Sequence, residues 1–241
     1  MPHTFKHATL IALSLGAAPV LAADGQRTFN VGTYDEVIVE GDISVTIDND
    51  APPSAKASGN PKLLNMLQFD RNGQTVKIRL VPATQTVGVG INMGTVQVQL
   101  AGRNVRKITV RGSGVASINT VKGTAAYFDL RGPGAISVGS LTSERVITLV
   151  NGSGRFSVAN GKISDASVKV NGTASVNMGD ALIDTLNLSQ AGAADTGFKV
   201  KSKATVSNSG SGKITITGTA TCTVVQGGSG SISCPEKGGK P

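Results

Sequence analysis

A short glycine triplet returns at a nearly fixed interval through the second half of the chain, and this repeat constrains the fold more than any other feature. The triplets are Gly112-Ser113-Gly114, Gly132-Pro133-Gly134, Gly152-Ser153-Gly154, Gly172-Thr173-Ala174, Gly192-Ala193-Ala194, Gly210-Ser211-Gly212 and Gly228-Ser229-Gly230. The interval between leading glycines is constant from Gly112 to Gly192 and slightly shorter for the last two triplets. A period of about 20 residues is typical of a solenoid, in which each repeat forms one coil and packs on its neighbours.

Inward-facing positions recur after each triplet. The positions four and six places after the leading glycine are mostly apolar, and they predict one strand per coil. They are Ala116, Ile136, Phe156, Val176, Thr196, Ile214 and Ile232, and then Ile118, Val138, Val158, Met178, Phe198, Ile216 and Cys234. A second strand follows, with inward pairs at Ala126 and Phe128, Ala166 and Val168, Leu186 and Leu188, Ala204 and Val206, and Cys222 and Val224. Thr148 departs from this second set, so Ile147 and Leu149 beside it predict a local register shift.

A short repeat with two or three inward-facing strands closes most naturally as a coil, and stacked coils pair their strands in parallel about 4.8 Å apart. The recurring glycine permits a tight corner that other residues resist. Only 3% of residues are aromatic while 39% are hydrophobic, which suits a narrow core filled by aliphatic side chains. An antiparallel β-sandwich would explain the alternation, but not columns that stay aligned at a constant interval.

The chain divides into five parts. Residues 1–22 have a basic start and an apolar run over residues 8–20, followed by Leu21-Ala22, which predicts a cleavable export signal. Residues 23–28 are polar and are expected to be flexible. Residues 29–111 form an N-terminal β region with the first coils, residues 112–234 form the glycine-punctuated coils, and residues 235–241 form a disordered tail. No other apolar run is long enough for a membrane helix.

The N-terminal β region is less regular than the coils. Its first apolar alternation predicts a half-buried strand pair that turns near Gly41-Asp42. Residues 60–69 predict a short helical or irregular turn, and residues 70–73 a hairpin turn. The acidic run at residues 48–50 predicts an ordinary turn, since a calcium loop needs more widely spaced oxygen ligands.

The two cysteines predict a disulfide at the C-terminal end of the solenoid. An even count in an exported chain favours pairing, and Cys222 and Cys234 both occupy inward columns of the last coil. We expect the bridge to close off the core where no further coil covers it; two buried free thiols are the alternative.

Basic residues predict the ligand-binding surface. The formal net charge is +8, which is compatible with binding to anionic polymers or envelope surfaces, although such a charge more often belongs to a solvated surface kept for solubility. Arg111 and Arg131 share one column on adjacent coils. The other candidates near them are Arg103, Arg106, Lys107 and Lys122, and a second basic row is Lys199, Lys201 and Lys203. Stacked cations could follow the charges of an anionic glycan, whereas the scarcity of aromatic residues disfavours nucleic acid.

An enzyme is the weaker interpretation, and no catalytic residue, metal site or cofactor is predicted. Glu144 and Asp184 share a column two coils apart, so their backbones should lie about 9–10 Å apart, at the upper end for an inverting carboxylate pair. Asp165 lies one column away on the coil between them. The histidines, His3 and His7, both lie in the export signal, so no histidine base or ligand remains after cleavage.

The triplets with their apolar columns, together with the lead-in from Phe29 to Ile47 and the segments around Leu64 and Ile78, resemble the exported bacterial family called "Putative auto-transporter adhesin, head GIN domain". The resemblance covers about residues 29–232. It implies a right-handed parallel β-helix and a surface or adhesive role in the periplasm or at the cell surface, with no established catalytic residues. Adhesion or binding of an envelope ligand therefore ranks first, a passive structural role second, and a polysaccharide-acting enzyme third.

Overall fold

A computed structural model describes residues 25–81 and 94–235. The predicted export signal, with both histidines, lies outside the described residues, as do residues 82–93 and residues 236–241 of the predicted tail.

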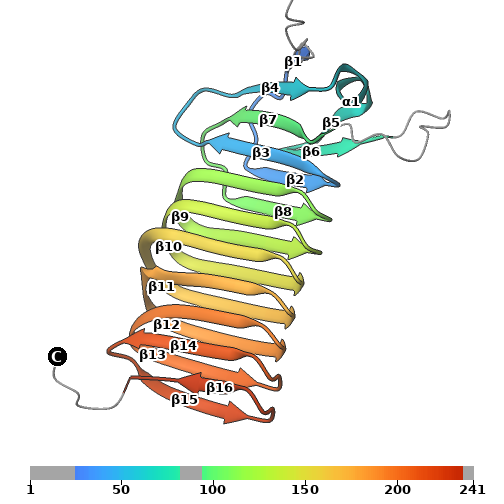
Figure 1. The fold of residues 1–241 in the computed structure, drawn as a ribbon. Coiled ribbons are helices and arrows are strands. Elements are labelled where there is room, and N and C mark those ends of the chain that lie inside the picture. Colours follow the sequence, from blue (N-terminus) through green and yellow to red (C-terminus); the bar gives the residue numbers. More distant parts are fainter. Residues whose placement is uncertain (1–24, 82–93, 236–241) are drawn as a thin grey trace, which may run out of the picture.

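The glycine-punctuated half of the chain is a parallel β-solenoid of about six turns (Figure 1). Each coil is one long, bent strand, and neighbouring coils pair in parallel along most of their length. The coil strands are β9 (Val115–Arg131), β10 (Ala135–Gly152), β11 (Arg155–Gly172), β12 (Ser175–Gly192) and β13 (Asp195–Asn208). The parallel β-helix predicted from the repeat is therefore confirmed.

Each coil has three walls. The pairing of β10 with β11 is interrupted at Gly139 and at Glu144, and these interruptions divide the coil into a first wall (residues 135–138), a second wall (140–143) and a third wall (145–152). The second wall contributes inward side chains that the two predicted strands did not include, among them Val121, Leu141 and Ile163. The core is therefore enclosed on three sides.

The leading glycines form the corner between the third wall and the first wall of the next coil. Gly132 and Gly152 have φ values of 112° and 126°, which favour glycine. A Cβ atom at Gly134 would collide with the carbonyl oxygen of Gly114 on the previous coil. Close stacking of the coils therefore explains why the triplets repeat.

Both predicted sets of inward columns are buried along the regular coils, with Phe128, Phe156 and Phe198 among the largest core side chains, whereas Val224 of the last coil, predicted to face inward, is exposed. The predicted register shift at Thr148 is wrong. Thr148 stays in register with Phe128 and Val168 and is fully buried, whereas Ile147 remains exposed. Pairing with both neighbouring coils holds the hydroxyl-bearing side chain in an inward position, although apolar neighbours offer it no partner.

The N-terminal part continues the solenoid and then closes it. Strands β2 (Glu36–Glu40), β3 (Ile43–Asp48) and β8 (Lys107–Arg111) pair in parallel within the solenoid. The elements β4 (Ser54–Gly59), β5 (Leu67–Asn72), β6 (Thr75–Leu80), β7 (Val96–Ala101) and helix α1 (Pro61–Met66) complete this end. The antiparallel pairs β1–β4, β4–β7 and β5–β6 occur here, so the end of the solenoid resists addition of a further parallel coil.

Two predictions for this region need correction, and two are confirmed. The start expected to be flexible contains β1 (Gly25–Phe29), whose backbone pairs with β4. The strands on either side of Gly41 are not partners, because β2 pairs with β6 and β8 whereas β3 pairs with β7 and β9; Gly41 lies at a corner between walls. The short helix is present as predicted, and a hairpin joins β5 and β6, although its turn lies at residues 73–74 and residues 70–72 belong to β5.

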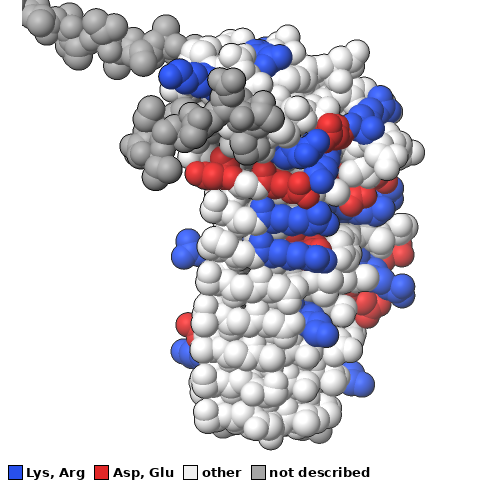
Figure 2. All heavy atoms as spheres, turned by 90° about the vertical axis from the view of Figure 1, so that its right-hand side faces the viewer, with Lys and Arg blue, Asp and Glu red and all other residues white. Residues whose placement is uncertain are grey.

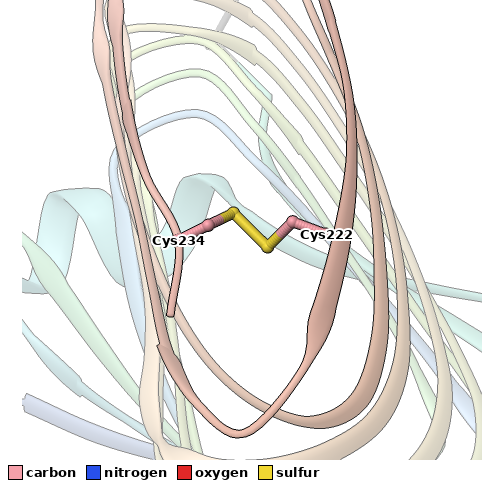
Figure 3. The surroundings of a disulfide bond; sticks show 2 residues. All are labelled: Cys222 and Cys234. Atoms are coloured by element: carbon pink, nitrogen blue, oxygen red, sulfur yellow. A yellow bond between two sulfur atoms is a disulfide. The ribbon is translucent and has the colours of Figure 1, made fainter. Parts of the chain in front are cut away.

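The C-terminal end is closed by the predicted disulfide. The last strands are β14 (Lys213–Gly218), β15 (Thr221–Gln226) and β16 (Ser231–Ser233). Cys222 and Cys234 are bonded, with their Cα atoms 6.5 Å apart, and the bridge crosses the interior of the final coil (Figure 3). It covers the end of the core where a further coil would otherwise pack.

Candidate functional site

A shallow hollow of about 530 Å³ follows the second wall across several coils. Two adjacent outward columns line it. One contains Lys122, Thr142, Lys162 and Leu182, which are in register on successive coils. The other contains Glu144, Ser164 and Asp184, at the corner into the third wall. The lining therefore carries both signs of charge.

A second hollow of about 720 Å³ adjoins the first, because Lys122 and Gly123 line both. Arg103, Arg106 and Asp35 also line it. Gly123 leaves room at the junction, since a Cβ atom there would lie 3.2 Å from Cδ of Arg106. We call the two together the joined hollow. Five cationic and three acidic side chains line it, so its net charge is positive.

The cations of the joined hollow differ in their partners. Arg106 Nη2 lies 3.1 Å from Asp35 Oδ2, but its Nε is buried and has no hydrogen-bond partner among the described residues. Lys201 Nζ is 3.7 Å from Asp184 Oδ1, and both side chains are about half exposed or more, so this pair contributes little. Lys122 and Lys162 are exposed and form no ion pair within the described part of the chain. The joined hollow thus retains cations available to a ligand.

The structure divides the six predicted basic residues between two surfaces. Arg103, Arg106 and Lys122 lie in the joined hollow. Lys107, Arg111 and Arg131 lie on the third wall, and Arg111 and Arg131 are in register on adjacent coils as expected from their column. Figure 2 shows the side of the solenoid where β8 and β9 end, with rows of cationic residues and acidic residues between them.

Each of the two stacked arginines forms an ion pair within the chain. Arg111 Nη1 is 2.8 Å from Glu40 Oε1, and Arg131 Nη2 is 2.8 Å from the nearly buried Asp129. The hydrogen bond to Asp129 raises the pKa of Arg131, while the hydrogen bond from Lys77, with help from Arg111, lowers the pKa of Glu40. A ligand anion at the third wall would have to compete with these carboxylates, so the joined hollow is the stronger candidate site.

The structure brings Glu144 and Asp184 into one hollow, whereas Asp165 lines a neighbouring depression with Glu144. Two strand spacings separate the backbones of Glu144 and Asp184 by about 10 Å, and the cationic Lys162 belongs to the coil between them. Within the described ranges, no three His, Cys, Asp or Glu residues form a group that could hold a metal ion.

The acidic turn at residues 48–50 serves the fold. Asn119 Nδ2 donates to Asp48 and Asp50, at 2.8 and 3.1 Å. Asn49 accepts from the Val105 backbone nitrogen and donates to the carbonyl oxygens of Val105 and Thr120. These bonds fasten the loop to the adjacent coil, which agrees with an ordinary structural turn.

Lys162 is the functional candidate that the sequence reasoning missed. Its neighbours in the same column on the adjacent coils, Thr142 and Leu182, are uncharged. A comparison of adjacent coils therefore does not reveal a row of charged residues at this position. Comparison of alternate coils would have found it, because Lys122, Lys162 and Lys199 occupy the same column at every second coil.

The described residues contain no helix able to cross a bilayer, since α1 spans only six residues.

Comparison with known proteins agrees with the fold. The model of the family described as "Putative auto-transporter adhesin, head GIN domain" matches residues 33–220. No curated protein matches the chain in sequence.

Solved structures share the architecture over most of the chain. A Bacteroides fragilis protein described as a putative adhesin has a TM-score of 0.71 at 14% identity, over 87% of this chain and 96% of its own. A putative adhesin of Parabacteroides merdae has a TM-score of 0.65 at 12% identity, over 87% and 95%. A Parabacteroides distasonis protein described as a putative lipid binding protein has a TM-score of 0.59 at 18% identity, over 87% and 96%. At these identities the likeness concerns the fold alone.

Proposed function

Since the chain belongs to the family "Putative auto-transporter adhesin, head GIN domain", we propose that it is an exported, adhesin-like, non-catalytic protein of the bacterial envelope that binds an anionic surface polymer in the joined hollow. The observation that carries the proposal is the pair of exposed cations on the outer face of the second wall, Lys122 and Lys162, which form no ion pair with another described residue. Arg103 extends the cationic lining into the second hollow. An elongated, open hollow suits a polymer chain better than a small molecule, which prefers a closed and mostly apolar pocket.

The polymer of this proposal is a glycan. The lining combines charged groups with hydroxyl groups, including Thr142 and Ser164, and such groups suit the carboxylates and hydroxyls of a polysaccharide. Charged side chains of both signs are spread through the lining, and a lipid tail would bury them without partners. Nucleic acid is disfavoured because base stacking needs aromatic side chains, and among the described residues the only aromatic one that lines the joined hollow is Tyr34.

The test is retention of the chain from Ala23 onward on an immobilised anionic glycan at low salt. We expect retention that disappears as salt is added, because exposed charges are screened. The Lys122→Ala/Lys162→Ala variant should elute at clearly lower salt, while Lys213→Ala should elute with the unchanged protein, because Lys213 is exposed on the first wall. Absence of retention at low salt would count against the proposal.

Two other functions have less support. A passive structural role would leave the chain without affinity for glycans, yet deletion would alter envelope integrity. A polysaccharide hydrolase or lyase would need Glu144 and Asp184 to act together. Their backbones lie about 10 Å apart, beyond the range of about 6.5–9.5 Å that separates the carboxyl groups of an inverting pair, and the coil between them contributes the cationic Lys162 to the same hollow. Turnover on a polysaccharide panel that is lost in Glu144→Gln would establish the enzyme instead.

A further inference from the structure

The charges of the second wall alternate from coil to coil. Lysines occupy one outward column at every second coil, at Lys122, Lys162 and Lys199. Acidic residues occupy the adjacent column on the intervening coils, at Glu144 and Asp184. Moving along the solenoid axis, a ligand would therefore meet a cation, then an anion, then a cation again.

The members between the lysines of this column are uncharged. Thr142 is exposed and Leu182 is half-buried, so neither supplies charge to its coil. Lys199 is also exposed and is in register with Leu182; the hollow itself ends at Lys201, which lies near Asp184. The cation repeat along the column is therefore two strand spacings, about 10 Å.

We propose that the joined hollow is selective for a linear glycan that runs along the solenoid axis and carries one carboxylate on every second sugar. This inference rests on the proposed function and specifies its ligand. One coil advances the wall by about 4.8 Å, close to the length of one sugar ring in an extended glycan. An anionic sugar then lies at each lysine coil, and the neutral sugar between them lies opposite Glu144 or Asp184, whose carboxylates accept hydrogen bonds from its hydroxyl groups.

The acidic residues exclude the more highly charged alternative. A glycan with a carboxylate on every sugar would place an anion beside Glu144 and another beside Asp184. Like charges in one site repel, and the repulsion is strongest at low salt. The wall therefore favours the polymer with fewer charges, whereas a general attraction to polyanions favours the polymer with more.

The experiment compares oligosaccharides of equal length that span at least the distance from Lys122 to Lys199, about 19 Å. Hyaluronan fragments carry a carboxylate on alternate sugars, oligogalacturonate carries one on each sugar, and oligomers of N-acetylglucosamine carry none. We expect calorimetric titration of the chain from Ala23 onward to rank hyaluronan above oligogalacturonate, with the neutral oligomer weakest. Binding that is tighter for oligogalacturonate would overturn the alternation while leaving the proposed function in place. No binding of either anionic oligomer would overturn both.

Substitutions separate the role of the lysines from the role of the acidic residues. Lys162→Ala should weaken hyaluronan binding by about three- to fivefold, the scale of one exposed ion pair, and Lys213→Ala should leave it unchanged. Glu144→Gln/Asp184→Asn should strengthen oligogalacturonate binding and remove the preference for hyaluronan. An unchanged preference in this double variant would show that the acidic residues do not select the ligand, and would overturn the inference.

Discussion

Replacement of Thr148 by valine should stabilise the protein, and this prediction tests the column assignment at its one anomalous position. Thr148 is fully buried in register between Phe128 and Val168. Its Oγ1 atom has no hydrogen-bond partner among the described residues. A buried hydroxyl without a partner lowers the free energy of unfolding by about 1–3 kcal/mol. Valine replaces this hydroxyl with a methyl group, which is favourably buried among apolar neighbours.

We therefore expect Thr148→Val to raise the free energy of unfolding by about 1–3 kcal/mol. In a chain of this size, each kcal/mol corresponds to a rise in the thermal midpoint of about 2–4 °C. Urea denaturation followed by circular dichroism, with thermal unfolding of the same samples, measures both quantities. An unchanged slope in urea would show that the variant alters stability and not the extent of unfolding.

Two control variants make the result specific. Thr148→Ser keeps the hydroxyl and loses a buried methyl group, so it should destabilise by about 1 kcal/mol. Thr124→Val changes an exposed threonine and should stay within about 0.5 kcal/mol of the unchanged protein. The reasoning is refuted if Thr148→Val is neutral or destabilising, because the hydroxyl would then have a partner or the residue would face outward.

Three further perturbations test the ends, the corners and the charged third wall. Cys222→Ala/Cys234→Ala should lower the free energy of unfolding by about 2–3 kcal/mol on the loop-entropy model, and an equal thermal midpoint with and without reductant would contradict the stapled end. Gly134→Ala should lower the free energy of unfolding by more than about 2 kcal/mol, because its Cβ atom would collide with the backbone of the previous coil. Gly197→Ala is the control, because a Cβ atom has room there and the free energy of unfolding should change little. If urea unfolding shows equal losses of stability in both variants, the coils are not closely stacked at Gly134. Folding lowers the pKa of Glu40. Its ion pairs therefore stabilise the folded protein fully at pH values above the pKa that the carboxyl has in the unfolded chain, and this stabilisation is lost as the pH falls through the lower pKa of the folded protein. Glu40→Gln should therefore remove part of the acid-induced loss of stability, and acid unfolding curves that superimpose would show that Glu40 has no such role.

The regular coils could be predicted from the sequence because their physical cause is local and repeated. A corner that only glycine tolerates, followed by inward residues at fixed offsets, positions every later side chain of the coil. The burial of Phe156 and Phe198 and the pairing of Cys222 with Cys234 follow directly from such columns.

The N-terminal closure and the ion pairs of the third wall depend on contacts between distant residues, and the repeat of the sequence does not indicate such contacts. The N-terminal closure needs antiparallel pairing between β1 and β4 and between β4 and β7. Residues 23–28 were predicted to be flexible only because they are polar, and their sequence does not indicate the strand β4 with which β1 pairs. The sequence shows the column of arginines on the third wall, but not their ion pairs with Glu40 and Asp129. Glu40 comes from a strand 71 residues away from Arg111.

The candidate site was recognised only in part for a related reason. Lys122 was predicted, with Arg103 and Arg106, as a residue near the column of Arg111 and Arg131, and the structure places these three in one hollow away from that column. Lys162 shares a column with Lys122, but only at every second coil. A search for equal charges on adjacent coils therefore passes over it, and the hollow itself depends on the shape of the second wall.

The most direct test of binding along the second wall is a titration of the isotope-labelled chain from Ala23 onward with hyaluronan fragments, followed by backbone amide chemical shifts. We predict that the largest changes in chemical shift form a continuous line through Lys122, Glu144, Lys162 and Asp184, and that they disappear in Lys122→Ala/Lys162→Ala. Changes centred on Arg111 and Arg131 of the third wall, or on Lys213 of the first wall, would contradict it.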